Sequence, residues 1–170
     1  MINGKIYSLA SNYRKRIVQA RQKGYFKNGK FEKFPYQCCG DTSSLLAEYL
    51  RENGVETLLV SGTESNTYET HAWLVVLDEQ IHSPRRNFDG VPDGIIDIFA
   101  SYGGSIVESM CYSECDIENG VIVDITGDQF GEEPVYVGDL DEFHKWFDQI
   151  KIYEHEGLFS DELIKLYEII

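Results

Sequence analysis

The strongest local pattern in the sequence is an amphipathic segment from Asp41 to Asn53. Its apolar residues recur at helical spacing and share one face: Leu45, Leu46, Tyr49 and Leu50. Asp41, Thr42 or Ser43 is suited to cap the first turn. Gly54 is suited to end the helix. The sequence predicts a helix here more clearly than anywhere else in the chain.

A second amphipathic segment lies near the N-terminus, between Ser8 and Lys23. Its apolar residues are mostly spaced as on a helix, and Gly24 supplies a stop. The connection to the helix at 41–53 is rich in turn residues, and Pro35 disfavours a helical backbone at the residue before it. The chain is therefore predicted to begin with two helices.

Runs rich in β-branched and aromatic residues, bounded by turn residues, then predict strands. They are VETLLVSG (55–62), HAWLVVL (71–77), VIVDITG (121–127) and PVYVG (134–138). The first two are close enough in sequence to form a hairpin. The segment 92–110 has the pattern of a helix interrupted by Gly103 and Gly104.

The C-terminal region predicts further helices. DLDEFHKWFDQI (139–150) and SDELIKLYEII (160–170) both open with acidic caps and carry apolar residues at helical spacing. Helices, then strands, then helices are typical of an α+β fold with a mainly antiparallel sheet. At 170 residues and 42% hydrophobic content, the chain is expected to form a single domain over residues 1–170 with one sizeable core.

The charge of the chain argues against some classes of partner. The formal net charge is -14, which repels phosphate backbones and anionic membrane surfaces. Nucleic acid and membranes are therefore not expected as partners, whereas a basic protein is compatible with the acidic C-terminal third. Neither a signal-peptide core nor a run of about 20 apolar residues is present, so a cytoplasmic location is expected.

In a reducing compartment the cysteines are expected to be free thiols: Cys38, Cys39, Cys111 and Cys115. The adjacent pair immediately precedes the helix at 41–53. A thiol at a helix N-terminus lies beside unpaired N–H groups and the positive end of the helix dipole, which both stabilise the thiolate. Cys39 has that placement, and Cys38 lies one residue further out. The alternative is that both are small buried apolar residues.

The predicted strands offer a base and an orienting carboxylate. His71 begins HAWLVVL, and the start of a strand is expected to leave its imidazole exposed. The imidazole should be oriented by a carboxylate on an adjacent strand, within hydrogen-bond reach of a ring nitrogen. Asp124 fits, because it closes the apolar run VIVD at its polar end. Asp97 in GIIDIF also ends an apolar run, but its surroundings are more helical, so Asp124 is preferred. The order Cys, His, Asp in these contexts indicates a thiol-dependent enzyme.

Three segments together resemble a known family: FPYQCCGDTSSLLAEYL (34–50), HAWLVV (71–76) and VIVDITGDQF (121–130). They resemble the papain-like cysteine peptidase superfamily, specifically its transglutaminase-like branch of small bacterial proteins. The resemblance implies a fold in which the helix carrying the cysteine packs on the sheet. It also implies Cys39 as nucleophile, His71 as general base and acid, and Asp124 as the orienting carboxylate. The segment from Asp78 to Gly120 is then an insertion between the His and Asp strands, and a candidate lid or specificity element.

The chemistry so implied is acyl transfer on a peptide, protein or small amide substrate, by hydrolysis, deamidation or transamidation, with no cofactor or metal. The backbone N–H of Cys39 and the side chain of Gln37 are candidate oxyanion donors. Cys38 is the alternative nucleophile if the helix starts earlier than predicted. The alternative function is a non-catalytic acidic binding module, such as an immunity or antitoxin protein that recognises a basic toxin by charge.

The remaining titratable residues give weaker signals. Cys111 and Cys115 lie four positions apart and could join a histidine at a zinc ion, but the sequence has neither a paired Cys-x-x-Cys motif nor a compact His pair. His144 and His155 lie in polar, helix-like sequence, where a solvated histidine is expected.

Overall fold

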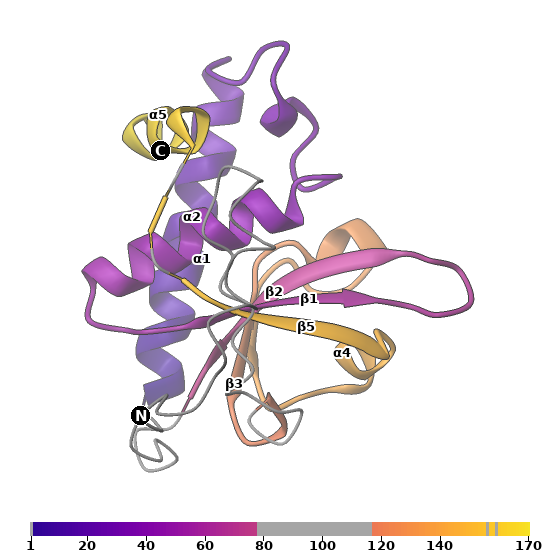
Figure 1. Ribbon diagram of the computed structural model, residues 1–170. Helices are drawn as coiled ribbons and strands as arrows, with labels where there is room; N and C mark the ends of the chain where they lie inside the picture. The colour runs from indigo at the N-terminus through magenta and orange to yellow at the C-terminus, as the bar shows by residue number, and fades with distance from the viewer. Residues whose placement is uncertain (1, 78–116, 156, 159) are drawn as a thin grey trace, which may run out of the picture.

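The computed structural model describes residues 2–77, 117–155, 157–158 and 160–170 (Figure 1). In chain order the elements are α1 (Ile2–Gln22), η1 (Lys30–Lys33), α2 (Cys39–Glu52), β1 (Leu58–Thr63), β2 (Thr70–Val76), β3 (Val121–Asp124), η3 (Gly127–Phe130), β4 (Tyr136–Gly138), α4 (Glu142–Lys145), β5 (Gln149–Glu154) and α5 (Asp161–Ile169). The η elements are short 3₁₀ helices.

The strands form one antiparallel sheet in the order β4-β3-β2-β1-β5. β1 and β2 form the hairpin expected from the sequence, with Gly62 opposite His71. β3 pairs with the other edge of β2, so Asp124 lies on the strand next to that of His71. The expected α+β class with an antiparallel sheet is confirmed, and β2 is the central strand.

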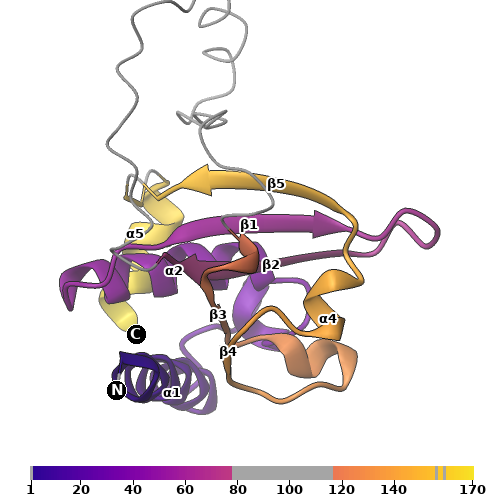
Figure 2. The same ribbon diagram turned by 90° about the horizontal axis from the view of Figure 1, so that it is seen from below.

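Apolar layers cover both faces of the sheet. Successive side chains of a strand point to opposite faces. Leu74 and Val76 of β2 belong to a core shared with α1 and α2, whereas Trp73 and Val75 belong to a second core that includes Phe147. Figures 1 and 2 show α1 and α2 packed beside the sheet. Burial on both faces explains why β2 is apolar along nearly its whole length.

Both N-terminal helices begin earlier than the sequence patterns indicate. α1 starts at Ile2, and α2 starts at Cys39, before the predicted first residue Asp41. The N-cap of α2 is Cys38, which makes no side-chain capping hydrogen bond. The prediction that a polar residue at 41–43 caps this helix was therefore wrong. These residues lie inside the first turns: Asp41 pairs with Lys30, the Ser43 hydroxyl donates to the Ala72 carbonyl, and the Thr42 hydroxyl donates to the sulfur of the N-cap Cys38.

The C-terminal region departs further from its predicted structure. The segment 139–150 was predicted to be a helix, but α4 spans only Glu142–Lys145 and residues from Gln149 enter β5. β5 pairs with the free edge of β1, with Ile152 opposite Val60. Edge pairing outweighs the helical spacing here, because β1 would otherwise leave its backbone hydrogen-bonding groups unpaired. The predicted last helix is present as α5, capped by Ser160.

Several sequence predictions lie outside the described residues. They concern the segment 92–110 with Asp97, the pair Cys111 and Cys115, and most of the predicted insertion at 78–120. In the part of the chain that the structure describes, no helix combines the length and the apolar character needed to cross a bilayer.

Gly62 is predicted to be essential for packing at the second core. A Cβ at this position would lie 2.5 Å from Cβ of Phe147 and 2.9 Å from the ring of Trp73. We predict that Gly62→Ala lowers the free energy of unfolding by about 1–3 kcal/mol, because the core has to shift to admit the methyl group. Urea unfolding followed by circular dichroism measures this difference.

Gly4→Ala is the matched control. Gly4 lies in α1, and a Cβ there meets no atom within 4 Å. This substitution should raise the free energy of unfolding by up to about 1 kcal/mol, since alanine favours the helix over glycine. Unchanged stability of Gly62→Ala would contradict the close packing at Gly62.

Candidate active site

Cys38 is a packed residue although it adjoins the candidate nucleophile. It is 2% exposed. Its thiol donates to the carbonyl oxygen of Pro35 at 3.2 Å, and the Thr42 hydroxyl donates to its sulfur at 3.6 Å. Burial raises the pKa of the Cys38 thiol to about 11. Cys38 is therefore a protonated thiol at neutral pH, and it matches the buried apolar role considered for both cysteines.

Cys39 has a different environment, because it is the first residue of α2 and is partly exposed. Burial acts to raise the pKa of its thiol. The His71 imidazole and the backbone N–H groups of Ala72 and Gly40 stabilise the thiolate and outweigh burial, so the pKa lies below its usual range. Of the two adjacent thiols, Cys39 is the one suited to react near neutral pH.

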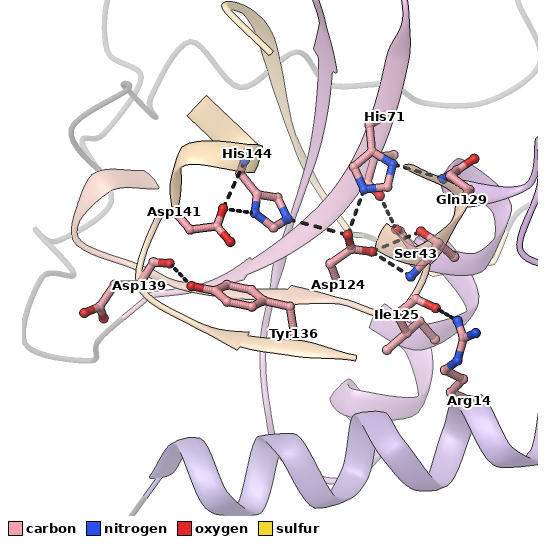
Figure 3. A network of polar contacts seen from close by, with 12 residues as sticks. Arg14, Ser43, His71, Asp124, Ile125, Gln129, Tyr136, Asp139, Asp141 and His144 are labelled. Carbon is pink, nitrogen blue, oxygen red and sulfur yellow. Dashed lines mark hydrogen bonds and ion pairs between the residues drawn. The ribbon is translucent and has the colours of Figure 1, made fainter. Parts of the chain in front are cut away.

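His71 and Asp124 form a buried pair. Nε2 of His71 donates to Oδ2 of Asp124 at 2.8 Å (Figure 3). This confirms the predicted contact, and it leaves Nδ1 of the ring for another partner. The expectation of an exposed imidazole was wrong: the side chains of His71 and Asp124 are 0% and 1% exposed. Thr70, the first residue of β2, is exposed, but aromatic rings from the chain after β3 cover His71.

The buried pair stabilises the charged forms of both groups. Burial acts to lower the pKa of His71, but the hydrogen bond with Asp124 and the nearby Cys39 thiol outweigh it and raise the pKa to about 9. Burial acts to raise the pKa of Asp124, but contacts with His144 and His71 hold it well below its usual range. The site therefore favours an imidazolium between a carboxylate and a thiolate.

The backbone after β3 fixes the carboxylate of Asp124. The N–H and the hydroxyl of Thr126 donate to Oδ1 at 2.8 and 3.0 Å. Oδ2 is thereby left for His71. Gly127 keeps the space beside this oxygen open, since a Cβ there would lie 3.1 Å from Oδ2. The sequence Asp-Ile-Thr-Gly thus gives the two carboxylate oxygens separate partners.

Polar contacts tie the elements of the site together (Figure 3). The Ser43 hydroxyl donates to the Ala72 carbonyl at 3.1 Å, which fixes the start of α2 against β2. Arg14 of α1 donates to the Ile125 carbonyl and pairs with Asp128 at 2.6 Å. The segments that carry the thiol, the imidazole and the carboxylate are therefore held by contacts outside the reactive groups.

Aromatic rings enclose the imidazole of His71. The centroids of four neighbouring rings lie 5.1 to 5.7 Å from that of His71: Trp73, Phe130, Phe143 and Phe147. An apolar shell of this kind lowers the local dielectric constant and strengthens the hydrogen bond between His71 and Asp124.

His144 is a second histidine at the carboxylate, and the sequence pattern missed it. The prediction of a solvated side chain was wrong, because His144 is 2% exposed. Its Nε2 lies 3.5 Å from Oδ2 of Asp124, and its Nδ1 lies 2.6 Å from Oδ1 of Asp141. The available signal was the spacing from Asp141, the N-cap of α4, to a histidine three positions later.

Gln129 is a further polar neighbour that the sequence did not single out. Its side-chain amide lies 3.2 Å from Nδ1 of His71, the ring nitrogen that faces away from Asp124. Gln37 is exposed and has a left-handed backbone, with φ of 59°. Its role as an oxyanion donor stays a prediction. His155 pairs with Glu48 at 3.0 Å, so it is not simply solvated.

Three buried residues could in principle hold a metal ion. One ligand atom each from His71, Asp124 and His144 lies within 4.8 Å of the others. An ion there would have to displace the proton that His71 donates to Asp124. The cluster fits a hydrogen-bonded network better than a metal centre.

Comparison of the chain with protein-family models, curated proteins and solved structures finds no match.

We predict that iodoacetamide modifies Cys39 much faster than Cys38 near neutral pH. The thiolate reacts, and the His71 imidazolium lowers the pKa of Cys39 whereas burial raises that of Cys38. The midpoint of the labelling curve for Cys39 should lie below the value of about 8.5 for a free thiol. Peptide mass mapping assigns each adduct and separates Cys111 and Cys115.

Removal of the imidazole should move this curve to higher pH. His71→Ala deletes the cation that stabilises the thiolate, so the pKa of Cys39 should rise towards that of a free thiol. Asp124→Asn should give a smaller shift in the same direction, because it weakens the imidazolium without removing it. A wild-type midpoint at or above about 8.5, unmoved by His71→Ala, would show that Cys39 is an ordinary thiol.

Proposed function

We propose that the protein is a thiol-dependent acyl-transfer enzyme of papain-like, transglutaminase-like character. In this proposal Cys39 is the nucleophile, His71 is the general base and acid, and Asp124 orients the imidazole. The observation that carries the proposal is the buried hydrogen bond between His71 and Asp124 next to a partly exposed thiol of lowered pKa. Packing alone does not account for a buried ion pair beside a helix-start cysteine.

The first half of the reaction forms a thioester. The Cys39 thiolate attacks the carbonyl carbon of an amide, and the carbonyl oxygen becomes an oxyanion. The imidazolium of His71 then gives its Nδ1 proton to the departing nitrogen as the carbon–nitrogen bond breaks. Asp124 holds the ring through Nε2 during this step, so that Nδ1 stays directed at the reacting atoms.

The second half releases the acyl group. Water or an amine attacks the thioester, and Nδ1 of His71 takes the proton of that nucleophile. The carbon–sulfur bond breaks, which returns the thiolate and the imidazolium. Water gives hydrolysis or deamidation, and an amine gives transamidation. The residues described at the site are compatible with each of these outcomes, which differ in the acceptor.

The start of α2 supports stabilisation of the oxyanion. The first N–H groups of a helix have no acceptor within the helix. The N–H of Cys39 belongs to this set and lies on the nucleophile itself, and the dipole of α2 adds positive potential at the same place. Gln129, beside His71, is a second available donor besides the sequence-predicted Gln37.

The competing function is a non-catalytic acidic module that binds a basic partner. Its support is the formal net charge of -14. Charge complementarity, however, requires none of the contacts at Cys39, His71 and Asp124. The two functions differ in an observable way, because only the enzyme forms a covalent acyl adduct.

We predict that Cys39→Ala abolishes acyl-enzyme formation while leaving the fold intact. Mass spectrometry of the protein, incubated with a panel of amide and ester acyl donors, detects the adduct. Wild-type protein should gain the mass of the acyl group, and Cys39→Ala should gain none. The thermal midpoint should change little, since the Cys39 side chain is partly exposed.

Cys38→Ala is the matched control at the neighbouring thiol. It should keep adduct formation but lower the free energy of unfolding by about 1 kcal/mol, because it removes a buried, hydrogen-bonded side chain. Loss of the adduct in Cys38→Ala but not in Cys39→Ala would reverse the assignment. Absence of any adduct on the wild-type protein would favour the binding module.

A further inference from the structure

His144 faces a carboxylate oxygen with each of its ring nitrogens. Nδ1 lies 2.6 Å from Asp141 on one side, and Nε2 lies 3.5 Å from Asp124 on the other. Figure 3 shows the ring lying between the two carboxylates, with Asp124 next to both His144 and His71. The ring is buried, and Nε2 has no hydrogen-bond partner among the described residues.

The partners of His144 come from several elements. Asp141 is the N-cap of its own helix α4, Asp124 ends β3, and His71 lies on β2 with ring centroids 6.3 Å apart. Tyr136 of β4 stacks at an angle on His144, with centroids 5.4 Å apart. A carboxylate therefore faces the ring at each of its two nitrogens.

The two ring nitrogens have different roles. The short contact with Asp141 fixes the direction of the ring, because Asp141 also accepts the backbone N–H of His144 at 3.0 Å. Nε2 then faces Oδ2, the same oxygen that accepts from His71. A buried carboxylate is stabilised by each donor it gains, and its position becomes more sharply defined.

We propose that His144 is a positioning residue, which holds the Asp124 carboxylate in place for His71 and is itself oriented by Asp141. The inference rests on the proposed function, since its effect reaches the thiol only through Asp124 and His71. His144 touches neither the substrate nor the nucleophile. It and Asp141 extend the series of neighbouring side chains that begins with Cys39, His71 and Asp124.

Labelling of Cys39 by iodoacetamide tests the proposal without a known substrate. His144→Phe keeps a ring of similar shape but removes both donors. The labelling midpoint should move to higher pH, with a rate about tenfold lower on the acid side of the curve, because a less constrained carboxylate supports the imidazolium less well. His144→Gln keeps one donor and should lie closer to wild type. His155 pairs with Glu48 and not with Asp124, so the control His155→Phe should leave the curve unchanged.

A double-mutant cycle separates positioning from general disruption. In the Asp124→Asn background, His144→Phe should cause no further shift, because the group through which it acts is already altered. Asp141→Ser keeps a capping side chain for α4 but is too short to hold the imidazole, so it should shift the curve in the same direction as His144→Phe. This variant decides the question if His144→Phe fails to fold.

The outcomes distinguish the inference from the proposed function. A low wild-type midpoint that neither His144→Phe nor Asp141→Ser moves would overturn the inference alone. So would a shift to lower pH, or a tenfold effect that persists in the Asp124→Asn background. A wild-type midpoint typical of a free thiol would overturn the proposed function, and the role of His144 with it.

Discussion

The candidate site depends on one buried charge, the carboxylate of Asp124, which needs hydrogen-bond donors from the residues around it. A carboxylate in an apolar interior is costly unless its oxygens accept hydrogen bonds or face cations. Thr126 donates hydrogen bonds to one oxygen of Asp124. His71 donates to the other oxygen, and His144 lies near it. The aromatic rings of the second core can therefore close around the pair without leaving an unsatisfied charge.

Local periodicity was enough to predict the elements that carry the site. The helix at α2, the hairpin of β1 and β2, and the strand β3 each combine a clear apolar pattern with flanking turn residues. Asp124 could be chosen over Asp97 because VIVD alternates as a strand does. The contact between His71 and Asp124 followed from placing both on adjacent strands, and the structure contains it at 2.8 Å.

The features that the sequence did not predict depend on tertiary partners. Residues 139–150 have apolar spacing compatible with a helix, and only the free edge of β1 selects the strand β5. The burial of His71 requires aromatic rings from the chain after β3, because Thr70, its neighbour on the same strand, is exposed. His144 is buried for the same reason, since a short α4 folds its ring onto the second core instead of extending into solvent.

The thiol, the imidazole and the carboxylate come from three elements, α2, β2 and β3, which meet only when the sheet and its covering helix have assembled. Every influence that lowers the pKa of Cys39 comes from the helix start or from a residue on another element. In an unfolded or nascent chain, Cys39 is consequently no more nucleophilic than its neighbour. Folding itself lowers the pKa of Cys39, so the thiolate is favoured only in the completed protein.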